Sequence, residues 1–453
     1  MNRVTLSSKL RDEPEAQADP PVMLSVLIIV WGEADNLDPL LDSLNRALNE
    51  IGESSEVLVA SGSGDSGLLE RVEERGLTLV EANGGGYGEI LRAGLAAAKG
   101  SFVLTMDGDL SHRPGYITTM WDHRDGGEVL IASRYVRGSF AEMPWLRRML
   151  SYLLNFVYRK TLSLPYRDLS SGLRMFKREV LDDIGLPGAK GLDALPEMLT
   201  KAVCQGWHVV EVPFWYQGAR PWTRARMIRL GIGFLRTLGK LFGLRNSVRA
   251  ADYDSRAFDS WIPLQRYWQR RRFRIVRGFV GDSRRVLDVG CGTSRIVNTL
   301  PSVVGFDLSI AKLRWIRAPG RHLVQGSLSN IPFTDQSFDA LICSEVIEHI
   351  PRQQVHLDQL IRVVRPGGIL VIGTPDYARL RWRVLEWLYD RLIPGGYTSE
   401  HVNPYTHDEL RHELEELGLD VIDCLYVGGG EMIFKGRVPL EASAIQSPAH
   451  HPN

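Results

Sequence analysis

The sequence predicts two α/β domains in tandem, joined by a basic helical segment. At 453 residues the chain is longer than one ordinary hydrophobic core requires. In both halves, short apolar runs alternate with longer segments of helical periodicity, a pattern typical of parallel sheets flanked by helices. Between the halves, residues 212–251 contain no Asp or Glu. This change of composition separates the two domains.

The expected strands are short apolar runs that fall into two groups. The first half has them at 25–30, 56–61, 77–82, 101–106 and 128–133, and the second half at 285–290, 303–308, 340–345 and 369–374. The sequence accordingly predicts a first domain over 22–222, a basic amphipathic helical linker over 223–262 and a second domain over 263–436. Disordered tails are expected at 1–21 and 437–453.

Composition narrows the classes of partner and compartment. The chain carries 54 basic and 54 acidic residues, so no overall field attracts nucleic acid, and we expect no nucleic-acid partner. No apolar run reaches the roughly 18 residues that a membrane-spanning helix needs. The four cysteines are scattered without a CxxC pair, which favours a reducing, cytoplasmic environment.

The linker contains an amphipathic pattern over residues 226–243. On a helical wheel one face carries Arg229, Gly233, Arg236 and Lys240, and the opposite face carries Met227, Phe234, Leu235, Leu238, Leu241 and Phe242. Two interpretations stay open. The helix lies in a membrane interface with its cations at lipid phosphates, which places the protein peripherally at the inner face of the plasma membrane, or it packs on the first domain with a solvated basic face.

The segment TMDGDLSHRPGY places two carboxylates, Asp107 and Asp109, at the end of an apolar strand. Positions two apart on a strand face the same way, so both carboxylates can share one Mg²⁺ or Mn²⁺ ion. An EF-hand loop is excluded because it needs Gly where His112 stands and Glu where Thr118 stands. Haloacid dehalogenase phosphatases carry such a pair on the first strand, whereas three expected strands precede this one. An ordinary strand-end turn is the structural alternative.

Four further segments accompany this pair in order, namely SVLIIVWGEADNL, GYGEILRAGLAAAKG, IASRYVRGS and DLSSGLRMFKREVL. Together, over 22–222, they resemble the dolichyl-phosphate mannosyltransferase-like members of the family 2 glycosyltransferases, which have the GT-A fold. The resemblance implies that Asp107 and Asp109 hold the metal that bridges the diphosphate of a nucleotide sugar. It also implies a catalytic set containing Arg134, Asp168 and Arg174, with the two arginines as forks for phosphate oxygens. The implied acceptor is a polyprenyl phosphate or a lipid-linked glycan.

One segment departs from the family pattern. Where the family carries an acidic pair that reads the nucleotide base, ASGSGDSG has Ala60 and Ser61, although Asp65 is retained. An alternative function therefore stays open, in which the first domain only binds the glycan or lipid phosphate and delivers it to the second domain.

In the second half, RVLDVGCGTSRIV reads as a strand, a glycine turn and a helix. A dinucleotide fingerprint would need Gly where Arg295 stands, so a dehydrogenase is excluded. With GSLSNIPFTDQSFDALICSEVIEHI and VVRPGGILVIGTP, the segment resembles the Rossmann-like class I S-adenosylmethionine-dependent methyltransferases over about 265–435. The resemblance implies a cofactor site that contains Asp288, Gly290, Gly292, Asp307 and Leu328. Ser294 and Ser327 depart from the family pattern.

Methyl transfer to a hydroxyl group also requires that a proton be removed. His349 and His401 are the candidate bases, with a structural role as the alternative for each. Residues 377–397, rich in Trp, Tyr, Leu and Arg, read equally as a lid over the acceptor or as a helix that covers the sheet. The sequence therefore predicts a bifunctional enzyme that transfers a sugar to a polyprenyl phosphate or lipid-linked glycan and methylates a related saccharide.

Overall fold

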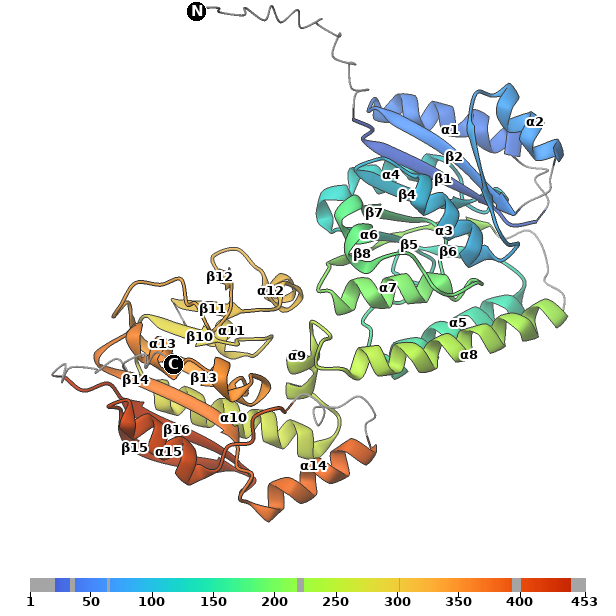
Figure 1. The fold of residues 1–453 in the computed structure, drawn as a ribbon. Coiled ribbons are helices and arrows are strands. Elements are labelled where there is room, and N and C mark those ends of the chain that lie inside the picture. Colours follow the sequence, from blue (N-terminus) through green and yellow to red (C-terminus); the bar gives the residue numbers. More distant parts are fainter. Residues whose placement is uncertain are drawn as a thin grey trace, which may run out of the picture.

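The computed structural model describes residues 21–32, 37–62, 66–217, 224–300, 302–392 and 401–440. It contains two α/β bodies. Helix α8 (Arg224–Asn246) packs on the first body, α9 (Tyr253–Phe258) follows it in the chain, and α10 (Pro263–Val280) packs on the sheet of the second body (Figure 1). Each body contains one seven-stranded mixed sheet. The expected class of two tandem α/β domains is confirmed.

The first sheet has the strand order β3-β2-β1-β4-β7-β5-β8. Its strands are β1 (Leu24–Val30), β2 (Ser55–Gly62), β3 (Thr78–Ala82), β4 (Phe102–Asp107), β5 (Val129–Ser133), β7 (Arg174–Lys177) and β8 (Val209–Pro213). All seven residues of β1 are buried, because helices cover both faces of a largely parallel sheet. The sequence did not predict β7, which pairs antiparallel with β4 and β5.

Helices pack on both faces of this sheet, and two separate clusters of buried apolar side chains fill the space between. The helices are α1 (Leu37–Ile51), α2 (Ser66–Glu74), α3 (Tyr87–Ala97), α4 (Gly115–Asp122), α5 (Trp145–Thr161), α6 (Arg178–Ile184) and α7 (Ala194–Cys204). Two short strands, β6 (Phe140–Glu142) and β9 (Trp215–Gln217), form a small separate sheet. In Figure 1, α5 and α8 lie alongside each other at one end of the first body.

Helix α8 packs on the first body through one stripe of side chains. Phe234 and Leu241 belong to the core of that body, Thr237 donates to Asp193 Oδ2 (2.6 Å), and the buried Arg245 pairs with Asp252. Two residues of the expected apolar face are exposed, since Leu235 is 69% and Phe242 40% exposed. The buried stripe recurs every three or four residues and follows the surface of the first body.

The second sheet has the strand order β12-β11-β10-β13-β14-β16-β15. Its strands are β10 (Val286–Val289), β11 (Val303–Asp307), β12 (His322–Gln325), β13 (Phe338–Ser344), β14 (Val364–Pro375), β15 (Asp420–Val427) and β16 (Glu431–Arg437). The strand β16 pairs antiparallel with both of its neighbours. The helices are α11 (Ile296–Thr299), α12 (Ile310–Ile316), α13 (Leu357–Arg362), α14 (Leu380–Leu392) and α15 (His407–Glu416).

The two bodies meet where α12 contacts the end of α7. The Arg314 guanidinium lies 3.5 Å from the centre of the Trp207 ring and donates to Asp183 Oδ2 at 3.0 Å. Gly206 is required at this contact, because a Cβ at that position would lie 2.1 Å from the Ala311 carbonyl oxygen. This contact fixes α12, which follows the carboxyl end of β11, against the first body.

None of the helices in the described segments combines the length and apolar character that crossing a bilayer demands.

Candidate active sites

The paired carboxylates lie at the carboxyl end of β4. The strand ends at Asp107, so Asp109 lies in the following turn rather than on the strand itself. Leu110 takes a left-handed backbone conformation (φ 62°), and the Ser111 backbone N–H donates to Asp109 Oδ1 at 3.0 Å. Asp109 is exposed. The turn, and not strand alternation, sets the direction of the second carboxylate.

Asp107 is partly enclosed by two rings. The Tyr87 hydroxyl donates to its Oδ1 (3.0 Å), and its own backbone N–H donates to Nδ1 of the buried His112 (3.0 Å). Burial raises the pKa of Asp107 above the usual range of a carboxyl. A nearby cation would offset this cost, and an oxygen donor set of two carboxylates is the kind that Mg²⁺ and Mn²⁺ prefer. The residues present fit a divalent cation.

Arg134 and Asp168 form a buried bidentate ion pair next to this site. The Arg134 Nε and Nη2 atoms each donate to an Asp168 oxygen at 2.7 Å, and Nη2 also donates to Ser170 Oγ at 2.8 Å. Although burial by itself raises the pKa of Asp168, the Arg134 charge outweighs it and lowers that pKa. Asp168 therefore fixes the orientation of the guanidinium.

Arg174 does not have the position that the sequence predicted. It is 1% exposed, and its nitrogens donate to three backbone carbonyls, namely those of Ser171 (2.8 Å), Leu195 (2.6 Å) and Leu169 (2.6 Å). Burial lowers its pKa to about 10. A side chain occupied in this way ties the 169–171 loop to α7, so the expectation that it binds phosphate oxygens is not supported.

A groove of about 380 Å³ leads from these residues along α5 and α8. Its polar end contains Asp107, His112, Arg134 and Arg147. The remaining wall is apolar and comes from both helices, with Leu150, Leu153, Leu154 and Val157 on α5 and Met227, Leu230, Phe234, Leu235 and Leu238 on α8. Sequence reasoning missed the contribution of α5, although its apolar and basic residues with no Asp or Glu were a usable signal.

The departure from the family pattern lies at the carboxyl end of β2. Ala60 is fully buried and Ser61 is 8% exposed. In the sheet they pair with Ile29 and Val30 of β1, so they lie at the same sheet edge as Asp107, which also pairs with Ile29. Asp65 lies outside the described residues, as do the Glu33 and Asn36 positions of the GEADNL segment.

The second candidate site begins at the glycine turn after β10. Gly290 (φ 65°) and Gly292 (φ 51°) are both left-handed, and a Cβ on Gly290 would lie 2.2 Å from Val346. Asp307, at the end of β11, accepts the backbone N–H groups of Gly292 (2.7 Å) and Ser309 (2.8 Å). The turn thus brings backbone without side chains close to the carboxylate of Asp307. Side chains in place of the two glycines would fill the space beside it.

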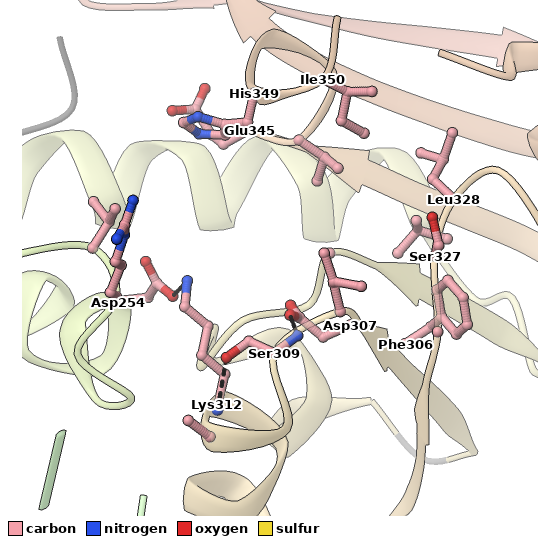
Figure 2. Close-up of a pocket in the computed structure, with 18 of the residues that line it drawn as sticks. Asp254, Phe306, Asp307, Ser309, Lys312, Ser327, Leu328, Glu345, His349 and Ile350 are labelled. Carbon is pink, nitrogen blue, oxygen red and sulfur yellow. Dashed lines mark hydrogen bonds and ion pairs between the residues drawn. The ribbon is translucent and has the colours of Figure 1, made fainter. Parts of the chain in front are cut away.

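A cavity of about 690 Å³ opens over this turn and is lined by Gly290, Asp307, Leu328 and His349 (Figure 2). Asp288 lies beside it and lines an adjoining cavity of about 110 Å³ together with Gly290. Burial raises the pKa of Asp288 to about 7, and Ser294 Oγ lies 3.4 Å from its Oδ2. All the expected cofactor residues therefore gather at the carboxyl ends of β10, β11 and β12.

Segments remote in sequence complete this cavity. From α9, Asp254 pairs with Lys312 of α12 (3.3 Å) and accepts the backbone N–H of Thr293 (3.2 Å) (Figure 2). Gln205 from the first body and Arg249 from the segment between α8 and α9 line the same cavity. The sequence held no signal for these residues, because only the packing of the two bodies brings them to the cavity.

One of the two candidate bases, His349, lies at the rim of this cavity. His349 lines it, with its ring centre 5.0 Å from that of His401. His401 Nδ1 lies 2.8 Å from the Tyr377 hydroxyl and 3.0 Å from Glu386 Oε1. Glu345, also at the rim, adopts a left-handed backbone (φ 61°) and pairs with Arg272 of α10 at 2.9 Å. A strained, charged residue of this kind at a cavity is a feature of functional sites.

Two protein families match the chain. Residues 25–185 match glycosyl transferase family 2, and residues 261–423 match a methyltransferase domain family. In the first half, the polyprenol monophosphomannose synthase of Mycolicibacterium smegmatis is 29% identical over 215 residues, which cover 44% of this chain and 80% of that protein.

The second half is similar to two further mycobacterial proteins. A probable S-adenosylmethionine-dependent methyltransferase of Mycolicibacterium smegmatis is 30% identical over 179 residues, covering 37% of this chain and 64% of that protein. A demethylmenaquinone methyltransferase of Mycobacterium tuberculosis is 29% identical over 156 residues, covering 33% of this chain and 65% of that protein. The chain thus spans just under two thirds of both methyltransferases.

Among solved structures, the first half is similar to glucosyl-3-phosphoglycerate synthase from Mycobacterium tuberculosis in complex with Mn²⁺, uridine diphosphate and phosphoglyceric acid. The identity is 18% and the TM-score 0.42, with 49% of this chain and 79% of that chain covered. A structural similarity of this size carries no functional argument.

Proposed function

We propose that this enzyme, which consists of a family 2 glycosyltransferase domain followed by a methyltransferase domain, transfers a sugar from a nucleotide sugar to a polyprenyl phosphate and methylates a hydroxyl group of a related saccharide. The observation that carries the first half of the proposal is the groove that joins Asp107 and Arg134 to an apolar channel between α5 and α8. A charged site that continues into an apolar channel suits an acceptor with a phosphate head and a hydrocarbon tail.

The sugar-transfer site would act mainly through positioning and charge. Asp107 and Asp109 would hold the divalent cation, whose chemistry is to stabilise the negative charge that develops on the departing diphosphate. Arg134, oriented by Asp168, adds a fixed cation at the polar end of the groove. The acceptor phosphate oxygen is already anionic at neutral pH, so it attacks the sugar carbon without a general base.

The surface of α5 and α8 is suited to a membrane. On α5 the exposed large apolar side chains are Trp145, Leu146, Met149, Leu150, Tyr152, Leu153 and Phe156, and on α8 they are Ile228, Ile232, Leu235, Phe242 and Leu244. Neither helix contains an acidic residue, and exposed basic residues such as Arg148 and Arg229 lie among the apolar ones. Exposed apolar area with interspersed cations matches helices that lie in the headgroup region of an anionic membrane. The groove would then open directly to the lipid.

In the methyltransferase domain, the residues around the larger cavity suit S-adenosylmethionine. Asp307 is placed to accept the ribose hydroxyls, Leu328 to pack on the adenine, and the acidic Asp288 to attract the ammonium group. The bound cofactor supplies an activated methyl group, and the chain's role is to align an acceptor oxygen with it. His349 at the cavity rim is the proposed base for the hydroxyl proton.

A double-label experiment tests both halves. The full chain is incubated with a panel of labelled nucleotide sugars, polyprenyl phosphate, Mn²⁺ and methyl-labelled S-adenosylmethionine. The proposal expects the sugar label in the lipid fraction and the methyl label on a saccharide. If no nucleotide sugar in the panel yields labelled lipid, the first half is wrong, and if no saccharide takes the methyl label, the second half is wrong.

Ala60 and Ser61 favour a second candidate function, in which the first domain binds the acceptor without transferring sugar. A neutral end of β2 removes the carboxylates that the family uses to read the nucleotide. Calorimetry with UDP- and GDP-sugars and Mn²⁺ separates the two candidates. Binding of either nucleotide sugar supports sugar transfer, and the absence of binding to all of them supports delivery alone.

A further inference from the structure

We propose that Glu348, His349 and His401 bind a divalent transition-metal ion that holds the acceptor hydroxyl at the rim of the methyltransferase cavity. The three side chains each offer one ligand atom, and these atoms lie within 4.8 Å of one another. Glu348 and His349 belong to the short helix η2 (Ile347–His349), and His401 comes from the segment after α14. The role of the ion rests on the proposed methyl transfer, whereas the site rests on the geometry alone.

The backbone holds the two segments together. The N–H groups of Val402 and Asn403 both donate to the Glu348 carbonyl oxygen, at 2.9 and 3.1 Å. His401 is therefore positioned beside Glu348 by hydrogen bonds that do not involve the side chains of the cluster. This arrangement makes the site pre-formed rather than dependent on side-chain movement.

Glu348 supplies the strongest sign that the cluster binds something. Its side chain is completely buried, and its Oε2 accepts from the Thr374 hydroxyl at 3.1 Å. Its other oxygen, Oε1, has no hydrogen-bond partner in the described part of the chain. A buried carboxylate oxygen without a partner is costly, because it has lost its water and gained nothing in return. A cation at the cluster would remove that cost.

The surroundings of His401 match those of a metal-binding histidine. Its Nδ1 faces the Tyr377 hydroxyl (2.8 Å) and Glu386 Oε1 (3.0 Å), and the Trp382 ring stacks on the imidazole. Metal-binding histidines typically donate their second ring N–H to a carboxylate, which fixes the ring and makes the other nitrogen a better ligand. Glu386 is that carboxylate here, so Nε2 is the nitrogen that would bind the ion.

His349 connects the cluster to the reaction. It lines the cavity that contains Gly290 and Asp307, and Figure 2 shows it beside Glu345, across the cavity from Asp307 and Ser309. Two imidazoles and one carboxylate suit a transition-metal ion and leave coordination positions open for substrate oxygens. The saccharide hydroxyl, or a pair of neighbouring hydroxyls, would take these positions.

The ion would lower the pKa of the hydroxyl group and hold its oxygen in line with the methyl carbon. The oxygen–carbon bond forms as the carbon–sulfur bond breaks, the sulfur keeps the electron pair of the broken bond, and the hydroxyl proton passes to water. This inference replaces the role of His349 as the base: its ring would hold the ion, and water instead of His349 would take the hydroxyl proton.

The test measures ion binding directly. The full chain with Asp107→Asn and Asp109→Asn, which removes the first metal site, is titrated with Mn²⁺ and Co²⁺ and followed by electron paramagnetic resonance and visible absorption. We expect one ion per chain. Adding Glu348→Gln should weaken binding by about 100-fold, and Glu386→Gln by about 10-fold, because the latter only loosens His401.

The matched control is the exposed pair His412 and Glu416 on α15; His412→Gln with Glu416→Gln should leave ion binding unchanged. S-adenosylmethionine binding by calorimetry shows that each variant is folded. The inference is overturned if neither ion binds or if Glu348→Gln binds as tightly as its parent. Ion binding that depends on Glu348 supports the site even where no saccharide is methylated, so its failure and that of the proposed function are distinguishable.

Discussion

The two sheets carry acidic residues at their carboxyl ends in opposite environments. At β4 of the first sheet, Asp109 is exposed and the Asp107 side chain is 29% exposed, and the groove beside them continues into the apolar surface of α5 and α8. At β10 and β11 of the second sheet, Asp288 is 4% and Asp307 9% exposed. Asp307 lines a cavity that segments from both bodies complete, and Asp288 lines the smaller cavity beside it.

The proposed function would account for this difference through the origin of each substrate. If a nucleotide sugar arrives from water and a lipid phosphate from a membrane, their site has to be open to both. A small soluble cofactor can be enclosed, and enclosure strengthens each electrostatic contact to it. The same edge of an α/β sheet thus serves two chemistries through the helices that cover it.

The largest expected effect is a loss of activity at the open site, the one formed around Asp107 and Asp109, without any loss at the second site. Asp107→Asn keeps the shape of the side chain and removes its charge, so the cation should be held weakly and sugar transfer should fall by about 10³-fold. Methyl transfer by the same chain should be unchanged. Both rates are measured by label incorporation, with the exposed Asp42→Asn as the control. A parallel loss of both activities would show that the two sites are not separable.

The second effect is a loss of cofactor binding at the enclosed site, the one formed around Asp288 and Asp307, without any change at the first site. Asp307→Asn removes charge-assisted hydrogen bonds to the ribose hydroxyls, each worth about 1.5–3 kcal/mol, so the Kd for S-adenosylmethionine should rise by about 10- to 100-fold. Calorimetry measures this, and nucleotide-sugar binding should not change. Asp335→Asn, at a side chain that is 70% exposed, is the control. An unchanged Kd would contradict the assignment of the cofactor site.

A smaller effect tests whether the open site faces a membrane. Met149→Glu with Ile228→Glu places two charges on the exposed faces of α5 and α8, at residues that do not line the groove. Binding to anionic vesicles should weaken by about 10-fold, while thermal stability stays the same. Co-sedimentation with vesicles measures this, and Leu69→Glu on α2 is the control. Wild-type vesicle binding by the double variant would exclude these two positions from the membrane contact.

The smallest effect concerns the pH dependence of the enclosed site. An unfolded Asp has a pKa near 3.9, and burial raises the pKa of Asp288 to about 7 in the folded chain. The folded state therefore favours the protonated carboxyl, so this contribution to stability is complete below about pH 4 and is lost as the pH rises to about 7.

In the absence of cofactor, the Tm of the wild-type chain should fall by a few °C more than that of Asp288→Asn between pH 5 and pH 8. Differential scanning calorimetry of the two chains measures the difference. Parallel Tm profiles for the two chains would contradict the raised pKa.

The strands and the glycine turn after β10 could be predicted because their signals are local. Every expected strand lies within an observed strand or extends past its ends by one or two residues, since continuous apolar runs such as Leu24–Val30 are buried on both faces. The left-handed backbone at Gly290 and Gly292 follows equally from the residue type. The antiparallel strands β7 and β16 were not predicted, because strand direction depends on the path of the chain between strands.

Arg174 and Arg134 show the limit of sequence reasoning about charge. The sequence makes both arginines candidates for phosphate binding, but it does not say what already occupies their donors. Folding places Arg174 among the carbonyls of Leu169, Ser171 and Leu195 and leaves Arg134 at the groove. The difference depends on contacts between segments that lie far apart in the chain.

By itself the sequence determined the two α/β domains and the carboxylates and glycines at the strand ends, because short-range periodicity and residue type encode these features. Only the tertiary structure decided that α5 joins α8 in an apolar surface, that Asp254 and Gln205 line the larger cavity of the second body, and that His401 lies beside Glu348. Each of these depends on long-range packing, which no local pattern records. The sequence identified Asp107 and Asp109 as a candidate metal site, and the fold showed that this site lies at the polar end of a groove.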